Sequence, residues 1–206
     1  MPNKSTVSEK TERSGRTVVD REAWLEVARD ALIRNGIDSV KVEPLAAQLE
    51  ISRSSFYWHF KNRRDLLDAL LGYWTKVNDK TLRQTLEPTK LNGADAESIA
   101  RIRLQQLADL FIHERGFSSQ FDLAIREWAR KDPLVAAEVV RIDNERIALL
   151  QRIFLDIGHS RRDSLVRAKI LYFHQLGYYL VGIQESAAVR QRVAPRYLEI
   201  LSGLKF

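Results

Sequence analysis

Residues 52–64, with the sequence SRSSFYWHFKNRR, combine basic, hydroxyl and aromatic side chains in one short stretch. Between residues 50 and 64 a single acidic side chain accompanies four basic ones, Arg53, Lys61, Arg63 and Arg64. The first 76 residues as a whole carry 13 Lys and Arg against 11 Asp and Glu, so the positive charge is local. Charge runs are usually solvated faces, but a local basic patch with short hydroxyls can also contact a large polyanion.

The aromatic residues of this stretch divide between interior and surface. Phe56 and Phe60 are four residues apart and share one face of a helix, so we expect them to pack in the core against the first helix. Trp58 has two open interpretations: it contacts a thymine methyl or a sugar, or it packs on the helix that follows. An aromatic framework of this kind favours phosphate or base contact by the basic residues over a merely solvated face.

The elements that position these residues are helices. Apolar residues recur at spacings of three and four, and only nine Gly and five Pro punctuate the 206 residues, which predicts an all-α fold. We expect a first helix from the capping residue Asp20 to Gly36, a second over about 43–49 and a third over about 53–59. The last two, separated by a tight turn at 50–52, form a helix-turn-helix outline.

Further helices fill the rest of the chain. Asn62 begins a fourth helix, with Asp65 reaching back as in a capping box, and this helix can last until Pro88. Turn formers cluster at 88–95, which is the clearest boundary along the chain. Later helices are expected over about 96–114, 119–131, 132–158, from Ser160 through the apolar run at 170–183, and over 195–204. The predicted organisation is a flexible arm at 1–17, a helix-turn-helix domain at 18–64 and a helical regulatory and dimerisation domain at 65–206.

Residues 36–74 resemble the N-terminal DNA-binding domain of the tetracycline-repressor (TetR) family. The matching residues are Gly36-Ile37, Leu45-Ala46, Ile51-Ser52, Phe56 to Phe60, Asn62-Arg63 and Leu66-Leu67. The YWHF block, followed by a basic residue and a Leu-Leu helix, is the most specific part. The resemblance implies an all-α protein in which an N-terminal three-helix helix-turn-helix domain is joined by a long helix to a larger C-terminal helical domain for dimerisation and ligand binding.

The resemblance also implies contacts with double-stranded DNA. The first turn of a recognition helix approaches base edges in the major groove, where Arg53 can pair with a guanine and Ser54 and Ser55 offer short donors and acceptors. By family position Tyr57 gives its hydroxyl to a phosphate. The predicted DNA-binding residues are Lys41, Arg53, Ser54, Ser55, Tyr57, Trp58, His59 and Arg63, the last placed beside the N-terminus of the fourth helix.

Three residues depart from the family pattern within this domain. Glu50 stands at a turn position where the family usually has glycine, which predicts mild backbone strain. Ser54 replaces a frequent Gly or Pro at the start of the recognition helix. Lys41 stands where a Thr usually caps the second helix, so it removes a side-chain cap and adds a charge that attracts phosphate.

The segment 170–183, ILYFHQLGYYLVGI, is apolar on almost every side. A helix of this kind must be buried on more than one face, and the family pattern uses the last two helices as a four-helix dimer interface. We therefore expect a homodimer through residues around 165–204. The alternative is the central helix of a monomeric bundle.

The family pattern also places a small-molecule effector among the middle helices. The predicted ligand-binding residues are Phe111, His113, Phe121, Trp128, Tyr172 and His174, with Phe154 and Tyr178 as further candidates. Such a pocket needs a few polar groups among apolar walls, and His113 and His174 suit that role because each lies inside an apolar run. The alternative for each histidine is an ordinary core position.

Other functional classes receive less support. The chain has no cysteine, its four histidines are isolated, and no H-E-x-x-H pair or glycine-rich phosphate loop occurs, so we expect no metal site, no cofactor and no catalytic residue. The polar N-terminus and the lack of a long apolar run predict a cytoplasmic protein without membrane contact. The expected function is a repressor released from a palindromic operator by a small apolar or aromatic molecule. The alternatives are an architectural DNA binder without ligand control and a helical enzyme.

Overall fold

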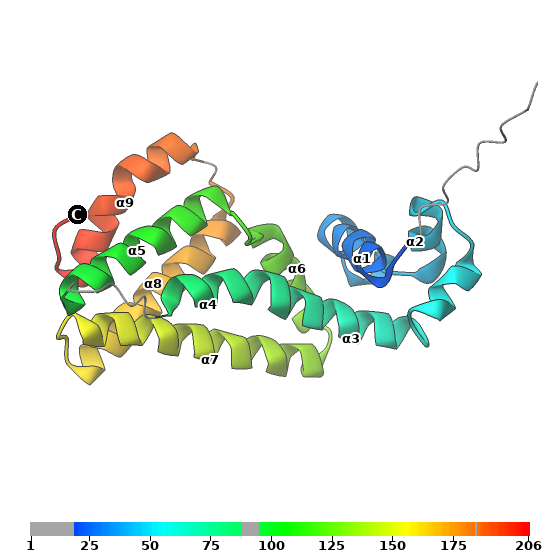
Figure 1. The fold of residues 1–206 in the computed structure, drawn as a ribbon, viewed down its shortest axis with the longest axis horizontal. Helices are drawn as coiled ribbons and strands as arrows, with labels where there is room; N and C mark the ends of the chain where they lie inside the picture. The colour runs from blue at the N-terminus through cyan, green and yellow to red at the C-terminus, as the bar shows by residue number, and fades with distance from the viewer. Residues whose placement is uncertain (1–18, 88–94, 184) are drawn as a thin grey trace, which may run out of the picture.

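The computed structural model describes residues 19–87, 95–183 and 185–206, and within these ranges the chain forms helices and no strand (Figure 1). The predicted all-α class is therefore confirmed. The arm predicted at 1–17 and nearly all of the boundary predicted at 88–95 lie outside the described residues.

The N-terminal domain consists of α1 (Arg21–Asn35), the 3-10 helix η1 (Ile37–Ser39), α2 (Val42–Gln48) and the 3-10 helix η2 (Arg53–Trp58). Asp20 caps α1 by accepting a hydrogen bond from the Ala23 amide at 2.9 Å, and Gly36 ends it at φ +74°. The third helix lies where it was predicted, but it is 3-10 rather than α. Hydrogen bonds to the third residue back, such as Ser55 N to Ser52 O at 3.0 Å, are common in so short a helix.

A long helix connects the two parts of the molecule. The α-helix α3 (Arg63–Trp74) passes through the π-helical segment η3 (Thr75–Asp79) into α4 (Lys80–Leu86), which confirms the predicted span (Figure 1). Asn62 Oδ1 accepts from the Asp65 amide at 3.0 Å, and Asp65 Oδ2 accepts from the Lys61 amide at 2.9 Å, one residue earlier than in a standard capping box.

The C-terminal domain contains α5 (Ala96–His113), α6 (Ser119–Ala129), α7 (Pro133–Asp156), α8 (Arg161–Val181) and α9 (Ala187–Ser202). Helix α7 runs beside α4 and packs against α8, while α9 packs against α5 (Figure 1). The prediction that the last helix begins at Pro195 is wrong, because α9 is capped by Ser186 and Pro195 lies inside it. Proline removes one backbone hydrogen bond from a helix, but here it lies on an exposed side while Leu198 packs into the core.

Two apolar clusters form the interior. The first joins α1, α2, η2 and α3 to α6 and the beginning of α7, and α6 contributes Phe121, Ile125 and Trp128 to it. The second joins α4, α5, the rest of α7, α8 and α9. Helix α3, which the sequence assigns to the domain beginning at 65, thus packs in the same cluster as the helix-turn-helix. Helix α6 is the wall of the C-terminal domain against which the N-terminal domain rests.

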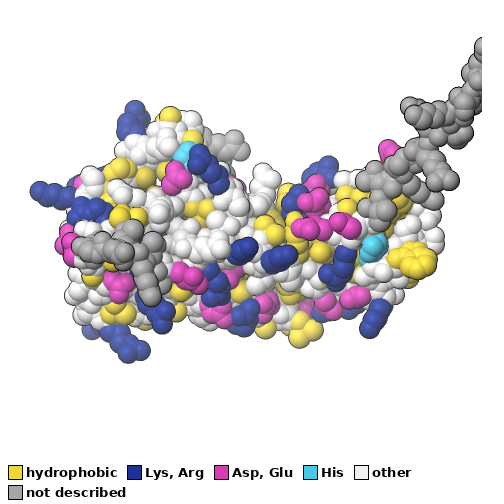
Figure 2. Space-filling view, in the orientation of Figure 1, with side chains coloured by type: hydrophobic (Ala, Val, Ile, Leu, Met, Phe, Trp, Pro, Cys, Tyr) yellow, Lys and Arg dark blue, Asp and Glu magenta, His cyan; other side chains and the backbone are white. Residues whose placement is uncertain are grey.

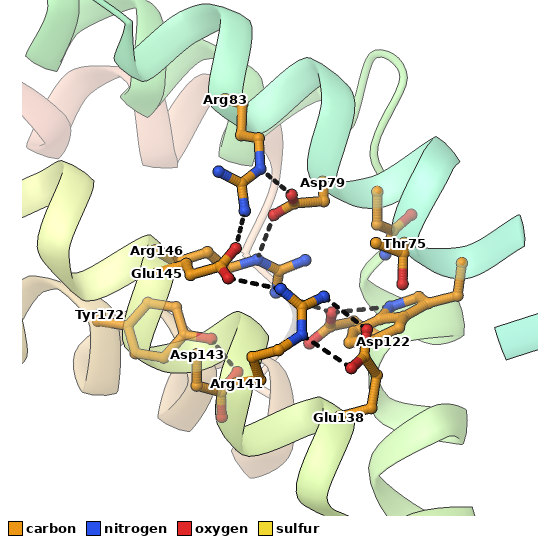
Figure 3. Close-up of polar contacts among 12 residues, drawn as sticks. Thr75, Asp79, Arg83, Asp122, Glu138, Arg141, Asp143, Glu145, Arg146 and Tyr172 are labelled. Atoms are coloured by element: carbon orange, nitrogen blue, oxygen red, sulfur yellow. Dashed lines mark hydrogen bonds and ion pairs between the residues drawn. The ribbon is translucent and has the colours of Figure 1, made fainter. Parts of the chain in front are cut away.

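A buried ionic network occupies the place where the two clusters meet (Figure 3). Arg146 of α7 donates from Nε to Asp79 Oδ1 at 3.3 Å and from Nη1 to Asp122 Oδ1 at 3.1 Å, and all three side chains are at most 4% exposed. The indole Nε1 of Trp74 also donates to Asp122 Oδ1, at 3.1 Å. Arg146 therefore binds the connecting helix and α6 at the same time.

Helices α6, α7 and α8 extend this network toward the surface. Arg126 donates from Nε to Asp122 at 2.9 Å, and its two terminal nitrogens bind the carboxylate oxygens of Asp143 at 2.8 Å each. Tyr172 of α8 donates its hydroxyl to Asp143 at 2.6 Å and accepts from Arg126 at 3.1 Å. On the other side Asp79 also pairs with Arg83 (Figure 3). Each acidic member thus has a cationic partner.

The cations keep Asp122 ionised in the interior. Burial alone would raise the pKa of Asp122, but the charges of Arg146 and Arg126 and their hydrogen bonds outweigh it and lower the pKa below its ordinary value. A carboxyl whose pKa is lower in the folded state than in the unfolded chain stabilises the fold above its unfolded pKa, about 3.9 for Asp. That stabilisation is lost as the pH falls through the folded pKa.

We expect Asp122→Asn to lower the free energy of unfolding by about 3–5 kcal/mol at neutral pH, because it leaves Arg146 and Arg126 without their shared anion. The loss should shrink at pH 3, which lies below the ordinary Asp pKa of about 3.9, because the unfolded wild-type chain there gains a proton that the folded state resists. Urea unfolding at both pH values measures this. The matched control is Asp68→Asn, which breaks an exposed ion pair with Arg64 and should cost less than about 1 kcal/mol. Equal losses in the two variants would contradict a special role for the network.

Candidate functional site

The helix-turn-helix presents its outer face on a rigid aromatic base. Phe56 and Phe60 are 0% and 2% exposed, their ring centroids lie 5.3 Å apart, and Trp24 of α1 meets Phe56 edge-on at 5.2 Å. The expectation that the two phenylalanines pack against the first helix is confirmed. Because these rings fix η2 against α1, the residues between them must point away from the core.

The outward residues of η2 include the predicted base and phosphate contacts. Trp58 is 86% exposed and Tyr57 is 54% exposed, so Trp58 does not pack on α3. Arg53 forms an ion pair with Glu43 of α2 at 2.8 Å, and its Nη2 donates to the Tyr57 hydroxyl at 3.4 Å. The hydroxyls of Ser52, Ser54 and Ser55 form a hydrogen-bonded group next to Arg53, with Oγ to Oγ distances of 2.8 and 3.2 Å. Cationic, hydroxyl and aromatic groups are therefore accessible together.

The remaining predicted contacts lie at the edges of this face. Lys41 is exposed at the start of α2, and its side chain makes no capping hydrogen bond within the described chain, as the sequence predicted. His59 is half-buried. The guanidinium of Arg63 points inward: Nε donates to Val40 O at 2.6 Å and Nη2 to Ile37 O at 2.9 Å. Arg63 thus fastens the start of α3 to the loop before α2, a role that the sequence does not reveal.

Glu50 occupies the turn between α2 and η2 with a left-handed φ of +56°. The sequence predicted backbone strain here, because the family usually has glycine at this position. The amide of Glu50 donates to Ala47 O and that of Ile51 to Ala46 O, each at 3.1 Å, so hydrogen bonds hold the turn. This conformation costs a non-glycine residue on the order of 1 kcal/mol.

On the side drawn in Figure 2, Lys and Arg alternate with Asp and Glu along the middle of the molecule. Among the residues that the structure describes, the middle of this face therefore carries no basic patch of one sign.

A cavity of ≈ 80 Å³ lies between α5, α8 and α9. Most of its wall is apolar, with Leu104, Leu107 and Phe111 from α5, Leu171 from α8 and Leu198 from α9. A few polar side chains interrupt this wall, namely His174, Gln175, Tyr178, Glu185 and Arg190. An apolar enclosure with few polar groups is the usual form of a small-molecule site.

The structure separates the six predicted ligand residues. Phe111 and His174 line the cavity. Phe121 and Trp128 instead pack in the apolar cluster shared with the N-terminal domain, and Tyr172 belongs to the ionic network. His113 lies outside the cavity wall and bonds Asp109 and Gln191 at 3.0 and 3.2 Å. Of the six, only Phe111 of α5 and His174 of α8 therefore reach the cavity.

Sequence reasoning missed the charged residues that join the helices. Asp79, Asp122 and Arg146 each fall on the buried side of an amphipathic helix, and a charge on an apolar stripe is the signal that could have revealed them. Gln175 and Arg190, which line the cavity, lie on the facing helices α8 and α9. Their meeting depends on the antiparallel packing of those helices, and no local pattern encodes it.

Helices α8 and α9 also carry apolar side chains that face away from the core. Eight large apolar side chains on α8, on the loop that follows it and on α9 are at least 49% exposed. They are Val166, Ile170, Phe173, Leu180, Val181, Ile183, Tyr197 and Ile200. Monomeric proteins rarely leave so many large apolar residues on neighbouring helices in water. The all-round apolar character of 170–183 thus corresponds to a face that one chain leaves uncovered.

The described residues lack two features that mark other classes of protein. They contain no group of three or more His, Cys, Asp and Glu side chains that could hold a metal ion. Over the same residues, no helix has the length and apolar composition that a membrane span requires.

Comparisons with known proteins agree with this geometry. Residues 25–70 match the family model described as "Bacterial regulatory proteins, tetR family". The class D tetracycline repressor protein of Escherichia coli and the class H protein of Photobacterium damsela subsp. piscicida are each 42% identical to this chain over 180 residues, 85% of this chain and 72% of theirs. A transcriptional regulator from Rhodococcus sp. Rha1 has the same fold, with a TM-score of 0.63 at 20% identity, over 90% of this chain and 95% of its own. The chain therefore belongs to the tetR family of bacterial regulatory proteins and is a DNA-binding transcriptional regulator.

Proposed function

We propose that the protein is a ligand-responsive repressor that binds a palindromic operator as a homodimer and is released by a small molecule. One observation carries the DNA-binding part: Trp58 and Tyr57 stand 86% and 54% exposed beside Arg53 on a helix whose Phe56 and Phe60 are buried. Large aromatics in water are costly unless a partner covers them. Repression is supported by the names of the two tetracycline repressors that the chain resembles.

Each predicted DNA contact has a specific task in this proposal. Arg53 reads a guanine, and Ser54 and Ser55 contact nearby base edges or phosphates. Tyr57, His59 and Lys41 position the helix on phosphates, and Trp58 contacts a thymine methyl or a sugar. Arg63 holds the loop before α2 through hydrogen bonds from Nε to Val40 O and from Nη2 to Ile37 O. Only its Nη1 therefore remains to bind a phosphate.

The apolar face of α8 and α9 supports dimerisation through residues around 165–204. A partner copy would cover Leu180, Phe173 and Ile200, which are 70%, 56% and 65% exposed. The same face on a second chain forms a two-fold interface in which each patch covers its equivalent. Two recognition helices in one particle then bind two half-sites, and the second binding event becomes intramolecular.

The cavity between α5, α8 and α9 is the effector site in this proposal, and α8 links it to the DNA-binding domain. Leu171 of α8 lines the cavity, and the adjacent Tyr172 bonds Asp143 and Arg126 of the ionic network. Arg126 binds Asp122, which accepts from Trp74 on the connecting helix. A ligand that prefers an α8 position incompatible with operator spacing lowers DNA affinity, and bound DNA lowers ligand affinity by the same factor.

Further parts of the proposal concern location and alternatives. A regulator that binds operator DNA works in the cytoplasm of a bacterium, and it needs no catalytic residue, cofactor or metal. The helix-turn-helix domain at 18–64 and the regulatory domain at 65–206 then divide DNA binding from effector binding. An operator complex that no small molecule affects would instead favour an architectural DNA binder.

Selection of bound DNA from a random pool tests the function directly. A symmetric dimer with one recognition helix per subunit should recover inverted repeats whose half-site centres lie roughly 34–36 Å apart or somewhat further. Recovery of asymmetric or unrelated sequences would contradict the proposal.

Arg53→Ala and Lys41→Ala should separate base reading from positioning. Loss of Arg53 should cost about 1–3 kcal/mol at the selected operator and relax the base preference, because a bidentate contact to guanine is removed. Loss of Lys41 should weaken operator and random DNA alike and reduce the salt slope by about one unit. Fluorescence anisotropy on both DNAs over a range of salt concentrations measures each effect. Identical losses of sequence preference in both variants would refute this division of roles.

Leu180→Glu should yield folded monomers with much weaker operator binding. The side chain is exposed in one chain, so the fold tolerates a carboxylate, but a dimer interface would bury that charge without a partner. Val140→Glu is the matched control, because Val140 is 58% exposed on α7, away from the apolar face of α8 and α9. Sedimentation velocity should show monomers for the first variant and dimers for the second. Dimers of Leu180→Glu at wild-type stability would place the interface elsewhere.

A further inference from the structure

The cavity between α5, α8 and α9 is polar at one end only. Helices α8 and α9 run antiparallel, since Arg167 donates to Leu201 O and the rings of His174 and Tyr197 lie 5.0 Å apart. Helix α5 is antiparallel to α9 as well, because Arg101 contacts Lys205 O and Arg190 contacts Ile112 O. One end of the cavity is therefore formed by Leu104, Leu171 and Leu201, and the other by Ile112, Tyr178 and Arg190.

The apolar end offers only hydrocarbon contacts. Leucine side chains from all three helices enclose it, and Leu104, Leu171 and Leu198 are between 1% and 8% exposed. A volume of ≈ 80 Å³ is about half of the ~150 Å³ apolar cavity that takes up benzene in another protein. The space suits a short hydrocarbon chain rather than a large polycyclic molecule.

The polar end has hydrogen-bond donors to spare. The side-chain Nε2 of Gln175 is buried and makes no hydrogen bond of ordinary geometry within the described chain. The hydroxyl of Tyr179, four residues further along α8, is a weak neighbour of this amide and leaves it free to turn toward a stronger acceptor. A buried donor is costly to the fold when it lacks a good acceptor. Tyr178 lies about one turn beyond Gln175 on α8. Arg190 of α9 stacks on the Tyr178 ring, with its guanidinium carbon 4.6 Å from the ring centroid. Its single hydrogen bond within the described ranges is a long one, 3.5 Å to Ile112 O.

We propose that the effector is a small amphiphile, a short apolar chain that ends in a carboxylate. The chain fills the leucine-lined end, and the carboxylate accepts hydrogen bonds from Gln175 Nε2 and the Arg190 guanidinium. A carboxylate offers two acceptor oxygens and a negative charge, which match one neutral donor and one cationic fork. This inference rests on the proposed function, in which the cavity is the effector site, and it adds the chemical class of the ligand.

The other polar groups at this end are compatible with an anion. Glu185 is exposed and accepts a hydrogen bond from the Tyr178 hydroxyl at 3.4 Å, so its charge remains hydrated. No carboxylate lies within 4 Å of the Arg190 guanidinium among the described residues, so its charge is available to a ligand. His174 and Tyr197, whose rings lie 5.0 Å apart, line the cavity, and Tyr197 also belongs to the exposed apolar face of α8 and α9, so an occupant would bear on the proposed dimer interface.

Three probes with one hydrocarbon chain and different head groups test the ligand class: hexanoate, hexan-1-ol and hexylamine. Isothermal titration calorimetry on the full chain should show hexanoate binding about 10- to 100-fold more tightly than hexan-1-ol, the factor of a hydrogen bond to a charged group. Hexylamine should bind weakest, because its ammonium group meets Arg190 and has no acceptor to offer Gln175. Equal or tighter binding of the alcohol or the amine, or no hexanoate binding at millimolar concentration, would overturn the proposal.

Substitutions locate the head group. Arg190→Gln and Gln175→Leu should each remove most of the preference for hexanoate over hexan-1-ol. The matched control is Arg192→Gln, because Arg192 is exposed on the opposite side of α9 and does not line the cavity. Operator affinity without ligand should equal that of the wild type in all three variants, which verifies folding and dimerisation. An unchanged preference in a folded Arg190→Gln variant would overturn the assignment.

The two proposals fail in different ways. If the chain binds a palindromic operator and another class of compound releases it while hexanoate does not bind, the regulatory function stands and the carboxylate assignment is wrong. If hexanoate binds through Arg190 and operator affinity stays unchanged, the site chemistry stands and its role as the switch is wrong.

Discussion

The pairing of Arg146 with Asp79 and Asp122 is the interaction on which the arrangement of the two domains depends. Three charges at most 4% exposed are held in the interior, where an isolated charge would cost far more than the fold could supply. Their charges compensate one another only while α7, α6 and the connecting helix keep their positions. Apolar packing alone would allow these helices to slide, whereas hydrogen bonds of definite direction fix their register.

The π-helical segment Thr75–Asp79 is a consequence of that constraint. A π turn adds a residue to the helix, and here it brings Asn78 and Asp79 to the buried side. Asn78 exchanges hydrogen bonds with the backbone of Ser118, from Nδ2 to Ser118 O at 2.8 Å and from Ser118 N to Oδ1 at 3.1 Å. Asn78 thus holds the connecting helix at the start of α6, while Asp79 holds it on α7 through Arg146. A movement of α6 or α8 must move the helix-turn-helix or break these contacts.

Local rules in the sequence predicted the helices and the buried side of η2, because both depend on neighbours in the chain. Asp20 and Asn62 cap helices as expected, and the spacing of Phe56 and Phe60 identified the core side of η2. Contacts between distant helices were less accessible. Arg63 reads as a phosphate ligand by position, yet it meets carbonyls 23 and 26 residues earlier in the chain. Phe121 and Trp128 read as pocket residues, although α6 faces the N-terminal domain.

Recognition of DNA must begin from the pairings that the free protein makes. Arg53 is bound to Glu43 at 2.8 Å, with both side chains about 60% exposed, so water competes effectively with the pair and it contributes little to stability. In the proposed operator complex, a guanine edge replaces Glu43 at little cost, and phosphates repel the carboxylate that is left. DNA that has no guanine opposite Arg53 offers this side chain no bidentate partner. On such DNA Arg53 stays paired with Glu43. The exposed pair therefore adds to discrimination between cognate and other sequences, while the buried aromatic base keeps the helix in place for either outcome.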